Sequence, residues 1–346
     1  MTDIVKSPAE TAPEPAGAPT LDRRTGWWAD DASEPVRRNL GLVVVLVAIW
    51  VVGAITVPRI FLHAGQLWDN ELIVLQQSAA IGVIAIGMTF VIIGGGIDLS
   101  VGKVMALASV WSTTVATQSY GATVMVICAV TVGMAAGLVN GVLIAYGRMA
   151  PFIVTLAMLA AARGLAERIS NKQSQLVTVA SINNLATTKP LGISLLVWIF
   201  GAVALVGWIV LNRTTYGRRT FAIGGNSEAA RLAGINVRRH TVTLYIVSGL
   251  CVGIAAIMIT SLTTTGSSTH GDLYELDAIA AVIIGGTSLS GGRGTIVGTV
   301  LGVVIFTTIS NLFVLNNLQT ETQDIVKGVI IVLAVLLQRR GKEGAV

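Results

Sequence analysis

The chain has 346 residues, of which 53% are hydrophobic and only 12% are charged. A soluble domain carries about 25% charged residues, so this composition excludes an ordinary soluble globular protein and favours a chain surrounded mostly by lipid. Glycine is abundant, with 38 residues, whereas proline is scarce, with 8, which suits closely packed transmembrane helices. With two cysteines and three histidines, the chain lacks the residues for a disulfide framework or a zinc site, and no metal site is expected.

Residues 1–39 form a polar segment that is rich in Pro, Ala and Glu and has no periodicity. Such a composition predicts a disordered tail. The segment does not resemble a signal peptide, which would open with a short basic region directly before its apolar stretch. We therefore expect the tail to be retained.

Ten apolar segments follow, and several of them reach the length of about 20 residues that a membrane-spanning helix needs. They cover residues 40–58, 72–93, 100–118, 122–146, 150–168, 192–211, 241–262, 278–289, 295–315 and 325–338. The sequence thus predicts an all-α, polytopic membrane helix bundle with about ten transmembrane segments over residues 40–340. Segments 278–289 and 325–338 are shorter than a straight span, so each either continues into less apolar flanks or is broken and buried within the bundle.

Basic residues in the loops predict the orientation. With ten crossings, Arg148, Arg293 and the loop 213–240 share one side, which we expect to be cytoplasmic together with the N-terminus and the tail 341–346. The opposite side then carries acidic residues that include Asp272. Three basic residues fall on this opposite side against the rule: Arg168, Lys172 and Lys189.

Asp98 is an acidic residue directly beside an apolar span. Intramembrane carboxylates are costly and often functional. Asp98 also lies at an expected helix end, between the glycines 94–96 and Ser100, where a capping or gating role explains it equally well. Substrate contact and ion coupling stay open as alternatives.

The stretch 96–104 resembles a phosphate-binding loop but has one residue too many before Gly102. It also has Val104 where a Ser or Thr would coordinate magnesium. The chain therefore cannot bind ATP by that route, and ATP-driven transport would need a second polypeptide. No catalytic constellation is present, and we expect neither an enzymatic activity nor a cofactor.

Glycines four residues apart predict places where helix backbones approach closely. Asn140 lies in such a run, formed by Gly133, Gly137 and Gly141, and its amide can hydrogen-bond across the contact. Similar pairs occur at residues 249 and 253 and at residues 298 and 302. Thr155 follows Pro151 at the expected start of another helix, which is an ordinary place for proline.

The loop 213–240 contains a short polar helix between two apolar segments. Asn226 or Ser227 can cap its start, Glu228 lies in the first turn, Arg231 lies toward its end and Gly234 stops it. Its other face carries Ala229, Ala230, Leu232 and Ala233. A helix of two turns is marginal in water, so docking against another protein would stabilise it. The alternative is a short amphipathic helix on the lipid surface, assisted by six arginines in the loop.

Residues 91–100 and 282–290 resemble each other with one gap, and each closes an apolar segment on the expected cytoplasmic side. A Gly and a basic residue, Lys103 or Arg293, follow each of them. Two such Gly-interrupted segments predict a transporter that arose by duplication, with breaks near the substrate route. A chance likeness between two Gly-rich turns is the alternative.

These motifs together resemble the permease subunits of bacterial ABC sugar importers, the ribose/xylose/arabinose permease family of the branched-chain amino acid/sugar permease superfamily. The matching stretches occur in the family's order and span about residues 40–340. They are residues 94–102, 140–141, 151–156, 222–235 and 284–294.

The resemblance implies a bacterial inner-membrane subunit that pairs with a second permease copy. Two ATP-binding cassettes, which are often fused in one ATPase chain, would lie on the cytoplasmic side, and an extracytoplasmic sugar-binding protein would lie outside. No nucleic-acid partner is expected. The segment 226–234 would be the coupling helix seated in the ATPase. The expected coupling residues are Gly225, Asn226, Glu228, Ala229, Ala230, Arg231 and Gly234. The expected residues of the translocation path or gate are Asp98, Ser100, Asn140, Thr155, Thr287 and Ser288.

Two other function classes compete with this interpretation. An ion-coupled secondary transporter of a small polar solute would need intramembrane coupling groups, for which Asp98 alone is the candidate. A membrane scaffold or receptor would bind partners but move no solute.

Overall fold

The computed structural model describes residues 27–343. The chain divides into two units, Met1–Arg37 and Arg38–Val346, and the described part of the first unit is the beginning of helix α1 (Trp27–Thr56). The tail expected over residues 1–39 therefore overlaps α1, because hydropathy marks only the apolar part of that helix. The disorder expected for residues 1–26 and the end of the tail at residues 344–346 lie outside the described residues.

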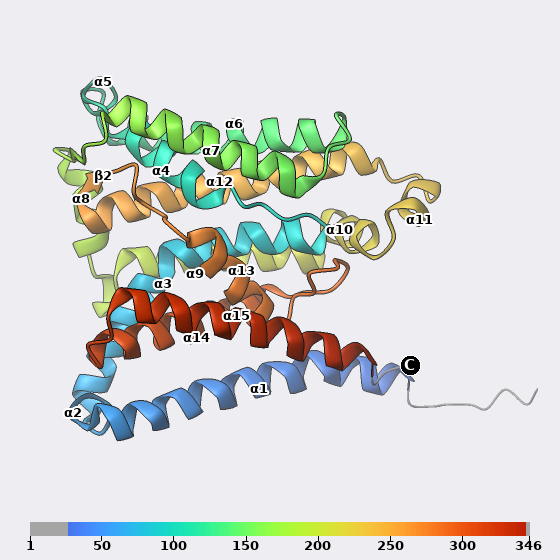
Figure 1. Cartoon of the computed structure of the whole chain (residues 1–346), viewed down its shortest axis with the longest axis horizontal. Helices are drawn as coiled ribbons and strands as arrows, with labels where there is room; N and C mark the ends of the chain where they lie inside the picture. The colour runs from blue at the N-terminus through green and yellow to red at the C-terminus, as the bar shows by residue number, and fades with distance from the viewer. Residues whose placement is uncertain (1–26, 344–346) are drawn as a thin grey trace, which may run out of the picture. The chain divides into compact units, whose positions relative to one another are not determined.

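The described chain is helical almost throughout, in agreement with the predicted all-α bundle (Figure 1). The helices after α1 are α2 (Pro58–Phe61), α3 (Ala64–Ile93), α4 (Val101–Ser112), α5 (Val115–Gln118), α6 (Ala122–Ala145), α7 (Pro151–Ser170), α8 (Ala180–Thr187), the 3-10 helix η1 (Pro190–Gly192), α9 (Leu195–Arg213), α10 (Thr215–Gly225), α11 (Ser227–Leu232), α12 (Val237–Thr263), α13 (Tyr274–Ile284), α14 (Ile296–Leu315) and α15 (Thr320–Glu343). Two short strands, β1 (Gln175–Leu176) and β2 (Thr265–Gly266), pair antiparallel with Gln175 opposite Gly266.

Six of the described helices are long and apolar enough to cross a membrane. They are residues Asn39–Thr56 of α1 and the whole of α3, α6, α9, α12 and α14. The other four predicted segments correspond to α4, α7, α13 and α15, which are short or carry charged residues. The helix count thus supports a polytopic bundle, while the number of about ten crossings stays a prediction.

The expectation of a continuous span over residues 100–118 is wrong. Helix α4 is only 12 residues long, and the chain leaves the helix at Thr113 and Thr114 before α5 begins. The Thr113 hydroxyl donates to the carbonyl of Ser109 at 2.9 Å, and that of Thr114 donates to Trp111 at 3.3 Å. Hydroxyls that bond back to nearby carbonyls compete with the regular helical ladder, which favours a break here.

Each of the two shortest predicted segments follows one of the two alternatives, either a continuation into polar flanks or a break within the bundle. Segment 325–338 continues into polar flanks and forms the 24-residue helix α15. Segment 278–289 is broken, because α13 has only 11 residues and most of them are buried.

Helices α4 and α13 are therefore each shorter than a full span, and non-helical chain precedes each of them (Figure 1). Residues 94–100 lead from the end of α3 back to the start of α4, and residues 267–273 lead from β2 to the start of α13. Irregular backbone at membrane depth is tolerated only where protein or a cavity covers it. In agreement, Asp98 and Ser100 are buried, as are Ser267 and Ser268.

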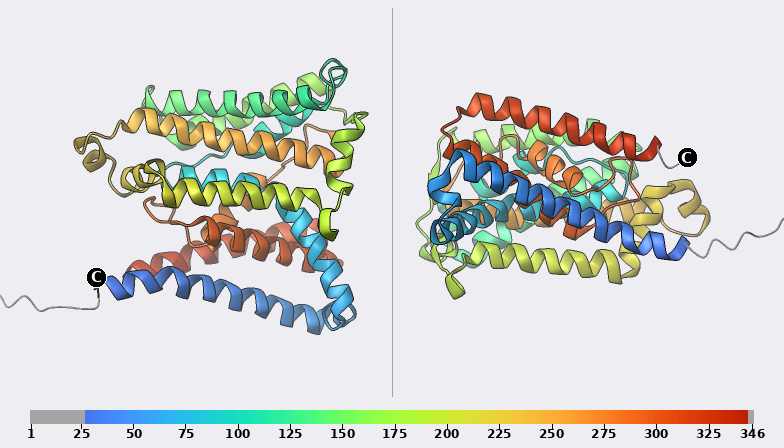
Figure 2. Two further views of the ribbon diagram at one scale, coloured as in Figure 1. Left: turned by 180° about the vertical axis from the view of Figure 1, so that it is seen from behind. Right: turned by 90° about the horizontal axis from the view of Figure 1, so that it is seen from below.

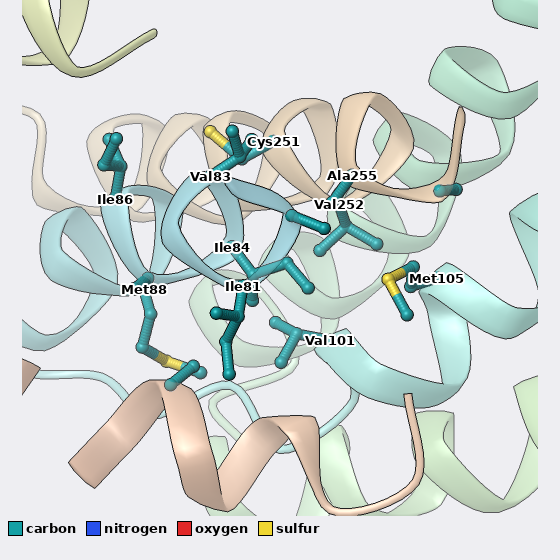
Figure 3. Packing of buried hydrophobic residues seen from close by; sticks show 14 of the residues in the cluster. Ile81, Val83, Ile84, Ile86, Met88, Val101, Met105, Cys251, Val252 and Ala255 are labelled. Atoms are coloured by element: carbon teal, nitrogen blue, oxygen red, sulfur yellow. The ribbon is translucent and has the colours of Figure 1, made fainter. Parts of the chain in front are cut away.

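The core forms around α3 and α12. Residues 78–93 of α3 are buried almost without interruption, and α12 packs against both α3 and α6. Figure 3 shows Ile84 of α3 in one cluster with Val252 of α12 and Val101 of α4. Lipid is as apolar as these side chains, so close van der Waals packing holds the helices together.

The predicted close approach at spaced glycines is confirmed. A Cβ at Gly133 of α6 would lie 2.2 Å from the Gly249 carbonyl oxygen of α12, and a Cβ at Gly302 of α14 would lie 2.1 Å from the Ala281 carbonyl oxygen of α13. Any larger residue at these positions would force the helices apart.

Candidate functional site

The short helix predicted between residues 226 and 234 is present as α11, and both of its ends are capped as the sequence indicates. The Asn226 side chain accepts hydrogen bonds from the backbone N–H groups of Glu228 (3.1 Å) and Ala229 (3.0 Å). Gly234 follows the helix with a φ of +82°, a left-handed conformation that favours glycine. Helix α11 lies at the end of the bundle opposite α5 and α8 in each view (Figures 1 and 2).

Helix α11 presents one face to its own chain and leaves the other open. Ala230 is buried, and its carbonyl accepts from the N–H of Ile235 at 3.0 Å, so this residue anchors the helix. Ala229 and Ala233 are exposed, and Leu232 is 75% exposed. An apolar side chain this open on a polar segment suits a surface that another protein covers.

Glu228 and Arg231 form an ion pair on the exposed side of α11, in which the Arg231 Nε donates to Glu228 Oε2 at 3.0 Å. The hydrogen bond from Arg231 lowers the pKa of the Glu228 carboxyl below its usual value, so the carboxylate stays charged at neutral pH. Both side chains are more than half exposed, so solvent screens the pair and it stabilises the fold little.

The two Gly-rich breaks that resemble each other in sequence also share a backbone geometry. Gly95 after α3 has a φ of +85°, and Gly286 after α13 has a φ of +83°. The N–H of the next residue, Gly96 or Thr287, donates to the carbonyl five residues earlier, at 2.9 and 3.1 Å. This is the Schellman cap in both places. The likeness is therefore structural, while its origin by duplication stays a prediction.

The end of α10 meets both breaks where glycine backbones lie close together. The N–H of Gly292 donates to the Ile93 carbonyl at 2.9 Å. A Cβ at Gly224 would lie 1.7 Å from the Ile93 carbonyl oxygen, and one at Gly291 would lie 3.1 Å from the Cα of Gly95. We refer to Gly95, Gly224, Gly291 and Gly292 as the glycine junction. Because α10 leads directly into α11, the glycine junction connects α11 to both breaks.

Three of the expected path residues meet in the interior. Asp98 Oδ1 accepts from the Ser100 hydroxyl at 2.6 Å and from the Ser100 N–H at 3.0 Å. The Asn140 amide of α6 donates to the Ser100 hydroxyl oxygen at 3.0 Å, and the Ser248 hydroxyl of α12 donates to Asp98 Oδ2 at 3.1 Å. All four side chains are buried, and we refer to them as the buried polar cluster.

The buried polar cluster lies deep in the bundle. Ser248 is near the middle of α12, so its hydrogen bond places Asp98 at mid-helix depth rather than at the end where α11 lies. Asp98 accepts the Ser100 N–H directly before α4 and thus helps to start that helix, as the capping interpretation expects. In the described part of the chain no basic side chain pairs with Asp98, and its carboxyl oxygens accept from the two serine hydroxyls and the Ser100 N–H.

The expectation that Lys103 and Asp272 lie on opposite sides of the membrane is wrong. Lys103 in the first turn of α4 donates to Asp272, and only 8% of the Lys103 side chain is exposed against 59% of the Asp272 side chain. A Cβ at Gly102 would lie 2.3 Å from the Gly271 carbonyl oxygen. The loop before α13 descends into the bundle and brings the starts of α4 and α13 together, which a count of loops cannot show.

Residues 71–335 match the protein family described as the permease component of the branched-chain amino acid transport system. The chain belongs to this permease family. Among its relatives, the ribose import permease protein RbsC of Bacillus subtilis is 42% identical over 273 residues, 78% of this chain and 85% of the relative. The L-arabinose ABC transporter permease protein AraH of Azospirillum brasilense is 35% identical over 337 residues, 96% of this chain and 95% of the relative. No solved structure matches.

The other three expected path residues of this permease lie apart from the buried polar cluster. The Thr155 hydroxyl donates to the Pro151 carbonyl of its own helix at 2.9 Å. Thr287 and Ser288 are buried in the loop after α13, where the Ser288 N–H donates to the Arg293 carbonyl at 2.9 Å. They therefore lie next to the glycine junction, at the end of the bundle where α11 is found.

Sequence reasoning missed two residues of the permease interior, Ser248 and Tyr245. The Tyr245 hydroxyl donates to the Ile97 carbonyl at 3.3 Å and so holds the non-helical stretch before α4. Ser248 directly precedes Gly249, one of the glycines through which α12 approaches α6. A small polar residue directly beside such a glycine was the available signal.

Proposed function

We propose that this permease is the membrane subunit of an ATP-binding-cassette importer and forms the translocation path for a monosaccharide, a pentose, hexose or sugar alcohol. Relatives named as ribose, L-arabinose and xylose permeases support this substrate class. ATP hydrolysis belongs to a separate subunit in this proposal. The observation that carries it is α11, a capped and exposed helix whose attachment passes through the glycine junction to both membrane breaks.

Helix α11 is proposed to dock in the ATPase as the coupling helix. Glu228, Ala229 and Arg231 would contact the ATPase, since all three are exposed. Asn226 and Gly234 would fix the two ends of the helix, and Ala230 would hold it to the permease. Gly225 would connect it to the glycine junction. Closure of the ATPases would then displace α11 and move both breaks together.

The translocation path is proposed to pass the buried polar cluster and to be gated near Thr287 and Ser288. Hydroxyl and amide groups can donate and accept hydrogen bonds without a net charge, which suits the hydroxyls of a neutral sugar. A sugar that enters would exchange these internal hydrogen bonds for its own. Thr155 lacks such a contact in this state, so its part in the path rests on sequence resemblance alone.

The complex is proposed to contain two ABC ATPases on the side of α11, an extracytoplasmic sugar-binding protein on the other side and a second copy of this permease. The six arginines of the loop 213–240 support a cytoplasmic position for α11 by the charge rule, and both termini would lie on the same side. The membrane would be the bacterial inner membrane.

Glu228→Arg tests the coupling role. The variant should insert and fold but lose ATPase association and ATP-driven uptake, which is measured by co-purification in mild detergent and by transport into proteoliposomes. Uptake that follows an imposed ion gradient in the absence of ATPase would instead support the secondary transporter.

A charge-swapped control separates docking from the pairing inside α11. The double variant Glu228→Arg/Arg231→Glu restores an ion pair in the helix but reverses the charges that face the ATPase. We expect it to be as defective as Glu228→Arg. Recovery of uptake by the swap would show that the pair only holds the helix, and the docking role of Glu228 would be rejected.

A further inference from the structure

A small pocket of about 180 Å³ lies between α10 and the first turns of α12. These two helices precede and follow α11 in the chain. Its polar lining comes from Tyr216, Arg219, Asn236, Arg239, His240 and Thr243. Typical pockets for drug-sized ligands measure about 300–1,000 Å³, so this one suits a single small group rather than a nucleotide.

Hydrogen bonds and ring packing hold the wall of the pocket in place. The Thr220 hydroxyl lies 3.0 Å from the Tyr216 carbonyl oxygen and 2.8 Å from His240 Nε2, and its hydrogen bond with His240 joins α10 to α12. The rings of Tyr216 and His240 lie 4.5 Å apart. The pocket is therefore preformed between two helices rather than an accident of mobile side chains.

The charge of the pocket is one-sided. Arg219 from α10 and Arg239 from α12 both line it, and none of its lining residues is acidic. In the described part of the chain neither arginine belongs to an ion pair, and the one acid of the loop 213–240, Glu228, is paired with Arg231. Two guanidinium groups that share one pocket repel each other unless an anion lies between them.

The donors in the pocket suit the oxygens of a phosphate group. Guanidinium groups bind phosphate through two parallel N–H···O bonds, and two of them approach here from two helices. The Asn236 side-chain oxygen already accepts from the backbone N–H of Arg239 at 3.0 Å. The side-chain NH₂ group of Asn236 is therefore left to donate to a ligand. The start of α12 adds the positive end of a helix macrodipole.

We propose that this pocket binds a phosphate group, supplied by the headgroup of an anionic phospholipid or by free phosphate. Helix α12 is long and apolar enough to span the membrane and begins at Val237, directly beside the pocket, so a headgroup can reach it. A bound phosphate would join α10 to α12 and so brace the two supports of α11. Occupancy would make the coupling segment stiffer.

The test uses the purified full chain in neutral phosphatidylcholine nanodiscs into which phosphatidylglycerol is titrated, with native mass spectrometry and the Tm as readouts. Arg219→Gln/Arg239→Gln should weaken phosphatidylglycerol binding roughly tenfold or more, since charge-assisted hydrogen bonds are lost. The matched control is Arg218→Gln/Arg238→Gln, which removes the same charge from the preceding residues of the same helices but leaves the pocket lining intact. This control should bind like wild type.

Equal weakening in both double variants would mean diffuse attraction of the basic loop to the membrane and would overturn the proposal, as would no weakening in either. If the pocket double variant does not fold, the single variants Arg219→Gln and Arg239→Gln are measured, and unchanged affinity in both counts against a site. Inorganic phosphate distinguishes the two sources. If millimolar phosphate displaces bound phosphatidylglycerol and reverses its effect on the Tm, the pocket recognises a phosphate group from either source. If phosphatidylglycerol binding depends on Arg219 but phosphate does not displace the lipid, the pocket recognises the lipid headgroup.

Discussion

The glycine junction and the buried polar cluster each join three segments of the chain, but the first does so through backbone atoms and the second through side chains. At the junction, the ends of α3 and α10 and the loop after α13 touch where no side chain intervenes. In the cluster, the stretch before α4 is joined to α6 and α12 by hydroxyl, amide and carboxylate groups. Backbone contacts cannot relax by changing rotamer, so they transmit movement. Side-chain hydrogen bonds can be exchanged for bonds to a passing solute.

The largest effect is expected from a substitution that disrupts the glycine junction. Gly224→Ala places a Cβ 1.7 Å from the Ile93 carbonyl oxygen, so the segments must separate, at a cost of roughly 1–3 kcal/mol or more for overpacking. We expect ATP-driven uptake to fall to background in proteoliposomes. Gly201→Ala in α9 is the control, because a Cβ there meets nothing within 4 Å, and it should transport like wild type. Normal uptake by Gly224→Ala would mean that the junction does not transmit movement.

A second prediction concerns the Lys103–Asp272 pair, which joins the starts of the two short helices near the cluster. Asp272→Asn removes the salt-bridge partner of the buried Lys103 and leaves the Ser268 carbonyl at 3.5 Å as its acceptor, so it should lower the free energy of unfolding by roughly 1–3 kcal/mol. Lys103→Met removes the buried charge itself and leaves an acid that water reaches, so it should be nearly neutral. Thermal unfolding in detergent measures both. A larger loss for Lys103→Met than for Asp272→Asn would contradict this order.

The smallest effect is expected from a substitution in the buried polar cluster. Ser100→Ala removes the donor to Asp98 Oδ1 and the acceptor for Asn140 together, and should cost about 1–2 kcal/mol. Thr155→Val is the comparison, because its hydroxyl bonds only to carbonyls of its own helix and its loss should cost less than about 1 kcal/mol. The Tm of each variant decides. Equal losses would mean that the cluster adds nothing beyond local helix bonds.

Local features of this permease could be predicted from its sequence. The caps of α11 at Asn226 and Gly234, and the close contact of α6 with α12 at Gly133 and Gly249, depend on short-range backbone chemistry that residue type reveals. Asp98, Ser100 and Asn140 were expected as separate candidates, and the structure joins them.

Features that depend on distant parts of the chain could not be predicted in this way. Hydropathy predicted a full span over residues 100–118, because the apolar composition continues past the helix break at Thr113. The same counting placed Lys103 and Asp272 on opposite sides, because it treats every stretch between spans as an external loop. A loop that re-enters the bundle has no periodic signal of its own.

The two short helices also have an electrical consequence. Helices α4 and α13 both begin where Gly102 lies against Gly271 and beside Glu275, so the positive ends of two macrodipoles point to the same depth. In the proposed translocation path, these positive helix ends would disfavour the passage of protons and metal cations. The passage of an uncharged solute along this path would therefore leave the transmembrane potential unchanged.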